Sequence, residues 1–64
     1  MIAYVARDKN GLLYLHDTMP ERDDDLEDYY SGSFFLLEDK DFPEFHDITY
    51  GNGAKEVEIN IKLV

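Results

Sequence analysis

The last residues of the chain alternate strictly between hydrophobic and polar side chains. The hydrophobic positions are Val57, Ile59, Ile61 and Leu63, with charged or amide side chains between them. A period of two is typical of a strand that has one buried and one exposed face in an antiparallel sheet. We therefore predict a C-terminal strand over residues 56–63.

The first sixteen residues predict a β-hairpin. Ile2 to Arg7 is rich in β-branched and aromatic residues, and Leu12 to His16 carries Leu, Tyr and Leu. The intervening Asp8-Lys9-Asn10-Gly11 allows either a type I′ turn on Asn10-Gly11 or a type I turn with Gly11 in the left-handed position as a bulge. The two turns differ in register by one residue on one strand. Each turn would bury a different face of that strand, and the sequence is compatible with either.

Two further hydrophobic runs lie in the second half of the chain. Ser33 to Glu38 contains Phe34-Phe35-Leu36-Leu37 and predicts a third strand. Because this run is apolar on both faces, it favours a central position in the sheet, although a buried helical turn has the same pattern. Ile48 to Tyr50 predicts a short fourth strand, ended by Gly51-Asn52-Gly53.

The segment from Pro20 to Asp28 does not have the pattern of a strand. Five of its last six residues are carboxylates, which repel one another and resist close cross-strand pairing. Proline followed by acidic residues resembles a helix start, because acids suit the positive end of the helix dipole. A short helix over residues 21–30, with Gly32 past its end, and a solvated loop are both compatible with this segment.

These elements predict a mostly β or α+β fold with one domain over residues 1–64. Its parts are the hairpin 2–16, an acidic insert 17–47 that forms a loop or short helix, and the strand 56–63. The sheet would be antiparallel, with three or four strands. A chain of this length buries only about 60% of the surface exposed when unfolded, and it has no cysteine to form a disulfide. Stability therefore depends on a small hydrophobic core.

The charged residues also separate the insert 17–47 from the rest of the chain. Twelve of the fifteen carboxylates lie between Asp17 and Asp47, where only Arg22 and Lys40 oppose them. The insert thus carries a formal charge of −10, against +1 for the rest and −9 for the whole chain. Such a surface repels DNA, RNA and anionic membranes. We expect partners to be basic proteins or cations.

The chain shows no signal for export or membrane insertion. The residues from Met1 to Arg7 have no basic region followed by an apolar stretch, so they do not resemble a signal peptide. The longest apolar run, Phe34 to Leu37, is far shorter than the ~20 residues of a membrane span. Together with the absence of cysteine, this predicts a cytoplasmic protein.

Residues for catalysis or metal binding are scarce. Ser31 and Ser33 lie in no nucleophile elbow, and no glycine-rich phosphate loop is present. The acidic run does not fit the ligand spacing of a calcium-binding EF-hand loop. His16-Asp17 and His46-Asp47 could in principle supply metal ligands, but surface or strand-end histidines are the simpler interpretation. We predict no catalytic residues, no cofactor and no dedicated metal site.

Aromatic side chains beside the acids suggest a binding surface. Tyr29-Tyr30, Phe42 and Phe45 either complete a thin core or anchor a partner that the carboxylates attract. The predicted partner-binding residues are Asp23, Asp24, Asp25, Glu27, Asp28, Tyr29, Tyr30, Glu38, Asp39, Asp41 and Glu44.

Several segments resemble a group of small uncharacterised acidic proteins of bacteria, their phages and mobile elements. The resemblance lies in residues 6–15, in Met19-Pro20-Glu21-Arg22, in Phe42-Pro43-Glu44 and in Glu56-Val57-Glu58. It implies a compact β-rich domain in a mobile-element setting and transfers no functional residues.

The charge profile alone is similar to that of DNA-mimicking inhibitors of restriction and CRISPR enzymes. The predicted function is a non-catalytic interaction module, which could be a phage-borne inhibitor that blocks the basic nucleic-acid-binding surface of a defence enzyme. One alternative is a structural or regulatory domain that forms a homodimer through an edge strand at residues 57–64. Another is a weak divalent-metal-binding domain that uses His16, His46 and nearby acids.

Overall fold

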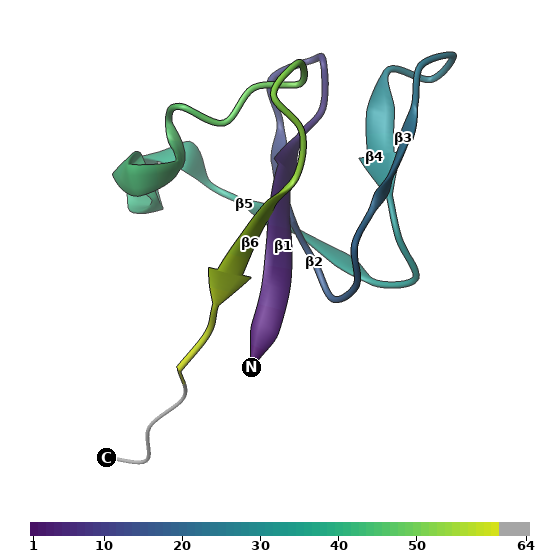
Figure 1. The fold of residues 1–64 in the computed structure, drawn as a ribbon. Helices are drawn as coiled ribbons and strands as arrows, with labels where there is room; N and C mark the ends of the chain where they lie inside the picture. Colours follow the sequence, from purple (N-terminus) through teal and green to yellow (C-terminus); the bar gives the residue numbers. More distant parts are fainter. Residues whose placement is uncertain (61–64) are drawn as a thin grey trace.

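The computed structural model describes residues 1–60, which form two antiparallel sheets (Figure 1). The main sheet has the strand order β5-β2-β1-β6, formed by β1 (Ile2–Arg7), β2 (Leu13–His16), β5 (Phe34–Leu37) and β6 (Lys55–Glu58). The second sheet is a hairpin of β3 (Glu21–Asp23) and β4 (Asp28–Tyr30). Two 3-10 turns follow β5, namely η1 (Asp39–Asp41) and η2 (Pro43–Phe45). The prediction of a mostly β or α+β fold with an antiparallel sheet of three or four strands is confirmed, in its mostly β form with four strands.

No helical segment within residues 1–60 has the length and apolar character needed to cross a lipid bilayer.

The β1–β2 hairpin closes through the second of the two predicted turns. The Gly11 N–H donates to the Asp8 carbonyl at 2.9 Å, and the Asp8 N–H donates to the Leu12 carbonyl at 2.9 Å. Gly11 has a φ of 95°, in the left-handed region that favours glycine. The turn is therefore a type I turn with a glycine bulge, and it sets the register that pairs Val5 with Leu15.

The two faces of the main sheet are covered by different segments. One face carries a core cluster of Val5, Leu13 and Ile48, against which residues of β2, β5, β6 and η2 pack. On the other face Ala6 and His16 are fully buried, and β4 lies against β1. Figure 1 shows the β3–β4 hairpin and the η1–η2 segment on opposite sides of the main sheet. The acidic insert is thus divided between the two faces.

The strand predicted over Ser33 to Glu38 is present as β5, but the predicted central position is wrong. β5 pairs with β2 alone and forms an edge of the sheet. Phe34, Phe35 and Leu36 are 51%, 65% and 56% exposed. A chain this short has too few elements to cover both faces at its edges, so an apolar run does not require a central strand here.

The short strand predicted over Ile48 to Tyr50 is also wrong, although Ile48 is buried. The backbone at Ile48 is satisfied outside any sheet, because its N–H donates to the Phe45 carbonyl at 3.0 Å and its carbonyl accepts from the Arg7 Nε at 2.7 Å. The Thr49 N–H donates to the Asn52 side chain at 2.9 Å. Side chains thus replace the strand partner that this segment lacks.

The C-terminal strand is confirmed over Lys55–Glu58, where β6 pairs with β1 and forms the second edge of the sheet. The alternation of exposure follows the prediction, since Val57 and Ile59 are half-buried while Glu56 and Glu58 are exposed. The predicted strand 56–63 extends too far, because β6 ends at Glu58 and neither Ile59 nor Asn60 belongs to a strand. Residues 61–64, which include the last part of the predicted strand and of the predicted dimer edge 57–64, lie outside the described residues.

The prediction that Pro20 to Asp28 is helix or loop and not strand is wrong, because this segment supplies β3, a turn and the start of β4. Repulsion among its carboxylates is offset by donors on both sides. The Arg22 Nε donates to Asp24 at 2.7 Å, and the Tyr30 hydroxyl donates to Glu21 at 2.6 Å across the two strands. The prediction against a strand considered the number of carboxylates and left out the side chains that donate hydrogen bonds to them.

Candidate functional site

The most concentrated acidic surface of the protein is the β3–β4 hairpin. Six carboxylates lie between Glu21 and Asp28, where the only basic residue is Arg22. The strands pair Glu21 with Tyr30 and Asp23 with Asp28. The hairpin therefore gathers the predicted residues Asp23, Asp24, Asp25, Glu27 and Asp28 on one small element.

The tip of this hairpin is held by its own side chains. The Asp23 Oδ1 accepts hydrogen bonds from the N–H groups of Asp25 at 2.9 Å and Leu26 at 3.1 Å. Glu27 closes the turn with a φ of 59°, a left-handed conformation that costs energy in a residue with a side chain. Hydrogen bonds thus hold the backbone at the tip in a defined turn, on which Asp24, Asp25 and Leu26 are exposed.

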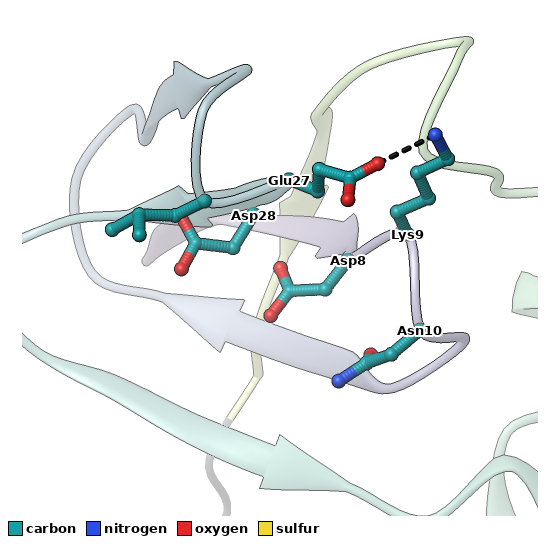
Figure 2. Close-up of a pocket in the computed structure, with 6 residues that line it drawn as sticks. Asp8, Lys9, Asn10, Glu27 and Asp28 are labelled. Atoms are coloured by element: carbon teal, nitrogen blue, oxygen red, sulfur yellow. Dashed lines mark ion pairs between the residues drawn. The ribbon is translucent and has the colours of Figure 1, made fainter.

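The hairpin is attached to the β1–β2 turn by hydrogen bonds at two points. The Tyr29 N–H donates to the Asp8 carboxylate at 3.0 Å, and the Lys9 N–H donates to the Glu27 carbonyl at 3.0 Å. Lys9 also forms an ion pair with Glu27, shown as a dashed line in Figure 2. This bond to Glu27 raises the pKa of Lys9. The acidic element is therefore docked on the β1–β2 turn of the main sheet.

Tyr29 is part of this attachment. Its side chain is buried, packs edge-on against Tyr50 with ring centroids 5.6 Å apart, and donates its hydroxyl to the Tyr50 carbonyl at 3.0 Å. Tyr50 in turn lies under the Arg22 guanidinium, 4.1 Å from its ring centroid. Tyr29 thus completes the core, and its place among the predicted partner-contact residues does not fit its burial.

Tyr30 and Leu26 are the exposed apolar groups of the hairpin. Tyr30 is 47% exposed, and its hydrogen bond to the Glu21 carboxylate raises the pKa of its hydroxyl. Leu26 is 71% exposed among the acids at the tip. Leu26 was not among the predicted binding residues, although it is the one apolar residue between Asp23 and Asp28.

An open hollow of about 440 Å³ lies between the hairpin and the β1–β2 turn, and its lining residues are Asp8, Lys9, Asn10, Leu26, Glu27 and Asp28. Figure 2 shows the carboxylates of Asp8 and Asp28 directed into the same space. Burial raises the pKa of Asp8, and the nearby charge of Asp28 adds to this effect, while the bond from Tyr29 opposes it. One Asp28 oxygen is buried without a hydrogen-bond partner within residues 1–60.

This hollow does not amount to a metal centre. Across residues 1–60, no three carboxylate or imidazole side chains are grouped so that they could hold a metal ion. The two histidines also lie in different settings. His16 is buried and bonded to Ser31 at 2.9 Å, whereas His46 is exposed beside the Asp39 carbonyl.

The remaining predicted acids form a second group on η1 and η2, on the other side of the main sheet (Figure 1). These residues are Glu38, Asp39, Asp41 and Glu44. Asp39 is engaged by Arg7 through two bonds of 2.8 and 2.9 Å, which lower the pKa of its carboxyl group. Glu38 lies 3.4 Å from Lys40. The structure thus divides the predicted binding residues into two surfaces.

Asp8 provides a test of how firmly the hairpin is docked. At pH 7, Asp8→Asn should keep or raise the free energy of unfolding, because the amide oxygen still accepts the Tyr29 N–H and the half-buried charge beside Asp28 is gone. Asp8→Ala should lower it by about 1–2 kcal/mol, because the buried N–H loses its acceptor. Urea unfolding followed by circular dichroism measures both.

The difference in unfolding free energy between Asp8→Asn and the unaltered protein should depend on pH in one direction only. Because the folded state raises the pKa of Asp8, ionisation costs stability as the pH rises through that pKa. The advantage of Asp8→Asn should therefore shrink as the pH falls and Asp8 takes up a proton in the folded state. An advantage that grows towards low pH would contradict the assignment.

Comparisons of the sequence with protein family models and with curated proteins, and of the fold with solved structures, found no match.

Proposed function

We propose that the protein is a non-catalytic interaction module that binds a basic protein surface through the tip of its β3–β4 hairpin. The observation that carries the proposal is the docked hairpin, which presents carboxylates around the exposed Leu26. Electrostatic attraction would bring a basic partner to the tip. Leu26 and Tyr30 would then supply the apolar contact, since charge alone contributes more to the rate of encounter than to affinity.

The kind of partner follows from the charge. A basic groove that normally holds nucleic acid carries the complementary potential, and an acidic hairpin could occupy it as a DNA mimic does. We propose a nucleic-acid-binding enzyme of the cytoplasm as this partner, with the module acting as its inhibitor in a phage or mobile-element setting. Because the η1–η2 acids lie on the other side of the sheet, the proposed contact is limited to the hairpin.

Asp25 is the best residue for testing the hairpin. Its side chain makes no hydrogen bond or ion pair within residues 1–60, so Asp25→Lys changes the charge without removing a contact that supports the fold. Asp41→Lys is the matched control, because Asp41 is an exposed aspartate on η1 that is equally free of side-chain contacts in this part of the chain. Both variants change the net charge by the same amount.

The first experiment uses a ten-residue peptide of alternating Lys and Leu as a defined basic probe. Asp25→Lys should weaken binding at least about tenfold more than Asp41→Lys, and the difference should shrink as salt is raised. Equal weakening by the two variants would show that only net charge matters and would reject the hairpin site.

The second experiment identifies the partner class. The unaltered protein and both variants are used as baits in extracts of the natural host at low and high salt, and the captured proteins are identified by mass spectrometry. The proposal expects a basic, nucleic-acid-binding protein that the unaltered chain and Asp41→Lys retain and Asp25→Lys loses. Addition of duplex DNA should displace it. Capture that duplex DNA leaves unchanged would overturn the assignment of a nucleic-acid-binding groove.

A further inference from the structure

The two edges of the main sheet differ sharply in character. The β6 edge carries Lys55, Glu56 and Glu58, and charged side chains of this kind discourage strand pairing with another molecule. The β5 edge carries Phe34, Phe35 and Leu36, each at least half exposed. No charged residue lies within residues 29–37. An apolar edge of this kind is open to pairing with a further strand.

The backbone of β5 shows which groups are free to pair. The Asp17 N–H donates to the Ser33 carbonyl at 3.2 Å, and the register places these two residues opposite each other. In an antiparallel ladder the residues that bond to one neighbour alternate with those that bond to the other. Phe35 and Leu37 therefore face β2, and the N–H and C=O groups of Phe34 and Leu36 face outward.

We propose that two copies of this chain pair through β5 in an antiparallel fashion, joining their main sheets into one eight-stranded sheet. A two-fold axis perpendicular to the sheet would pass between Phe35 and the partner's Phe35. Phe34 would lie opposite the partner's Leu36, and each of these two pairs would exchange two backbone hydrogen bonds. This proposal is independent of the function assigned to the hairpin tip.

The strand that pairs with β5 is proposed to be β5 of a second copy, because the β5 sequence is complementary to itself. In this register every residue of the pairing segment Phe34–Leu36 faces an apolar residue, and side chains of the same sheet face remain together. A shift of the axis to Leu36 would place Phe34 opposite the partner's Glu38. In a chain of net charge −9, residues 29–37 also form an uncharged segment at which two copies can meet without direct repulsion.

The oligomeric state tests the proposal directly. Sedimentation equilibrium between about 1 µM and 1 mM should show a dimer that increases with concentration. Phe35→Lys should remain monomeric over the whole range, because it would place two ammonium groups opposite each other at the axis. Leu26→Lys is the control, because Leu26 is 71% exposed on the distant hairpin and the charge change is the same. A monomeric unaltered chain, or a dimer that survives Phe35→Lys, would overturn the proposal.

The register can be tested by a single cysteine, because the chain has none of its own. In the proposed pairing, the Cα atoms at position 35 are about 4.5 Å apart across the axis, which a disulfide can bridge. Those at position 34 are offset by about 7 Å along the strands and lie beyond bridging distance. Phe35→Cys should therefore form a covalent dimer under mild oxidation and Phe34→Cys should not. Equal cross-linking of both would contradict this register.

Discussion

Replacement of Arg7 by alanine should lower the free energy of unfolding by about 3 kcal/mol or more and leave much of the protein unfolded. The Arg7 side chain is only 13% exposed. It donates to the carbonyls of Gly11 and Ile48 at 2.7 Å each and forms a two-pronged bond with Asp39. It thereby ties the β1–β2 turn and the η1–η2 segment to one side of the main sheet. The core of a domain of this size rarely supplies more than about 3–5 kcal/mol of stability.

Two further variants show whether this effect comes from the shape of the side chain. Arg7→Lys keeps the charge but loses the planar fork, so it should recover only a small part of the stability. Arg22→Ala is the control, because Arg22 also bonds to an aspartate at 2.7 Å but is 41% exposed. Urea unfolding at pH 7 should show a much smaller loss for Arg22→Ala than for Arg7→Ala, because the Arg22 ion pair is exposed to water and contributes little. Equal losses for Arg7→Ala and Arg22→Ala would contradict a central role for Arg7.

The role of Arg7 also shows where the sequence pattern is limited. Turn chemistry and strand alternation depend on neighbouring residues, so the sequence predicted the alternating exposure of β6 and reduced the β1–β2 turn to two alternatives, one of which is the observed glycine bulge at Gly11. The partners of Arg7 lie up to 41 positions away along the chain. No local pattern marks them, and the η1–η2 segment that Arg7 holds had no predicted structure.

The β3–β4 hairpin was missed for a related reason. A count of charges predicted repulsion along Pro20 to Asp28, but the donors that offset it are Tyr30, Arg22 and Lys9. Lys9 belongs to another element, so its contribution appears only once the chain is folded.

The sequence predicted which acidic residues make up the candidate site, but not how the fold distributes them over two surfaces. The acidic insert was evident from the sequence, and its hairpin part is indeed exposed at Asp24, Asp25 and Glu27. The burial of Tyr29 and the separation of Asp23–Asp28 from the η1–η2 acids depend on the packing of two segments on opposite faces of one sheet. Such packing follows from the whole fold.

The buried His16 should make the protein lose stability as the pH falls below about 6.5, the ordinary pKa of histidine. The side chain is 0% exposed, and burial lowers its pKa, although the charges of Asp8 and Asp17 act in the opposite direction. The Ser31 hydroxyl donates to the Ser33 carbonyl at 2.9 Å, so it accepts from His16 and fixes the proton on Nδ1. The Nε2 is buried without a partner within residues 1–60. Protonation at Nε2 would therefore create an unpaired donor and a buried charge.

The sign of the effect follows from proton linkage. Because the folded state lowers the pKa of His16, the unfolded chain takes up the proton first, and stability is complete only above the unfolded pKa. Below it, the free energy of unfolding should fall by up to about 1.4 kcal/mol per pH unit until the folded pKa is reached. His16→Gln cannot titrate here, so its urea unfolding between pH 7 and 5 isolates the part that His16 contributes. Because the carboxylates are common to both proteins, parallel curves would show that His16 is not the group responsible, whereas a steeper curve for the unaltered chain would identify it.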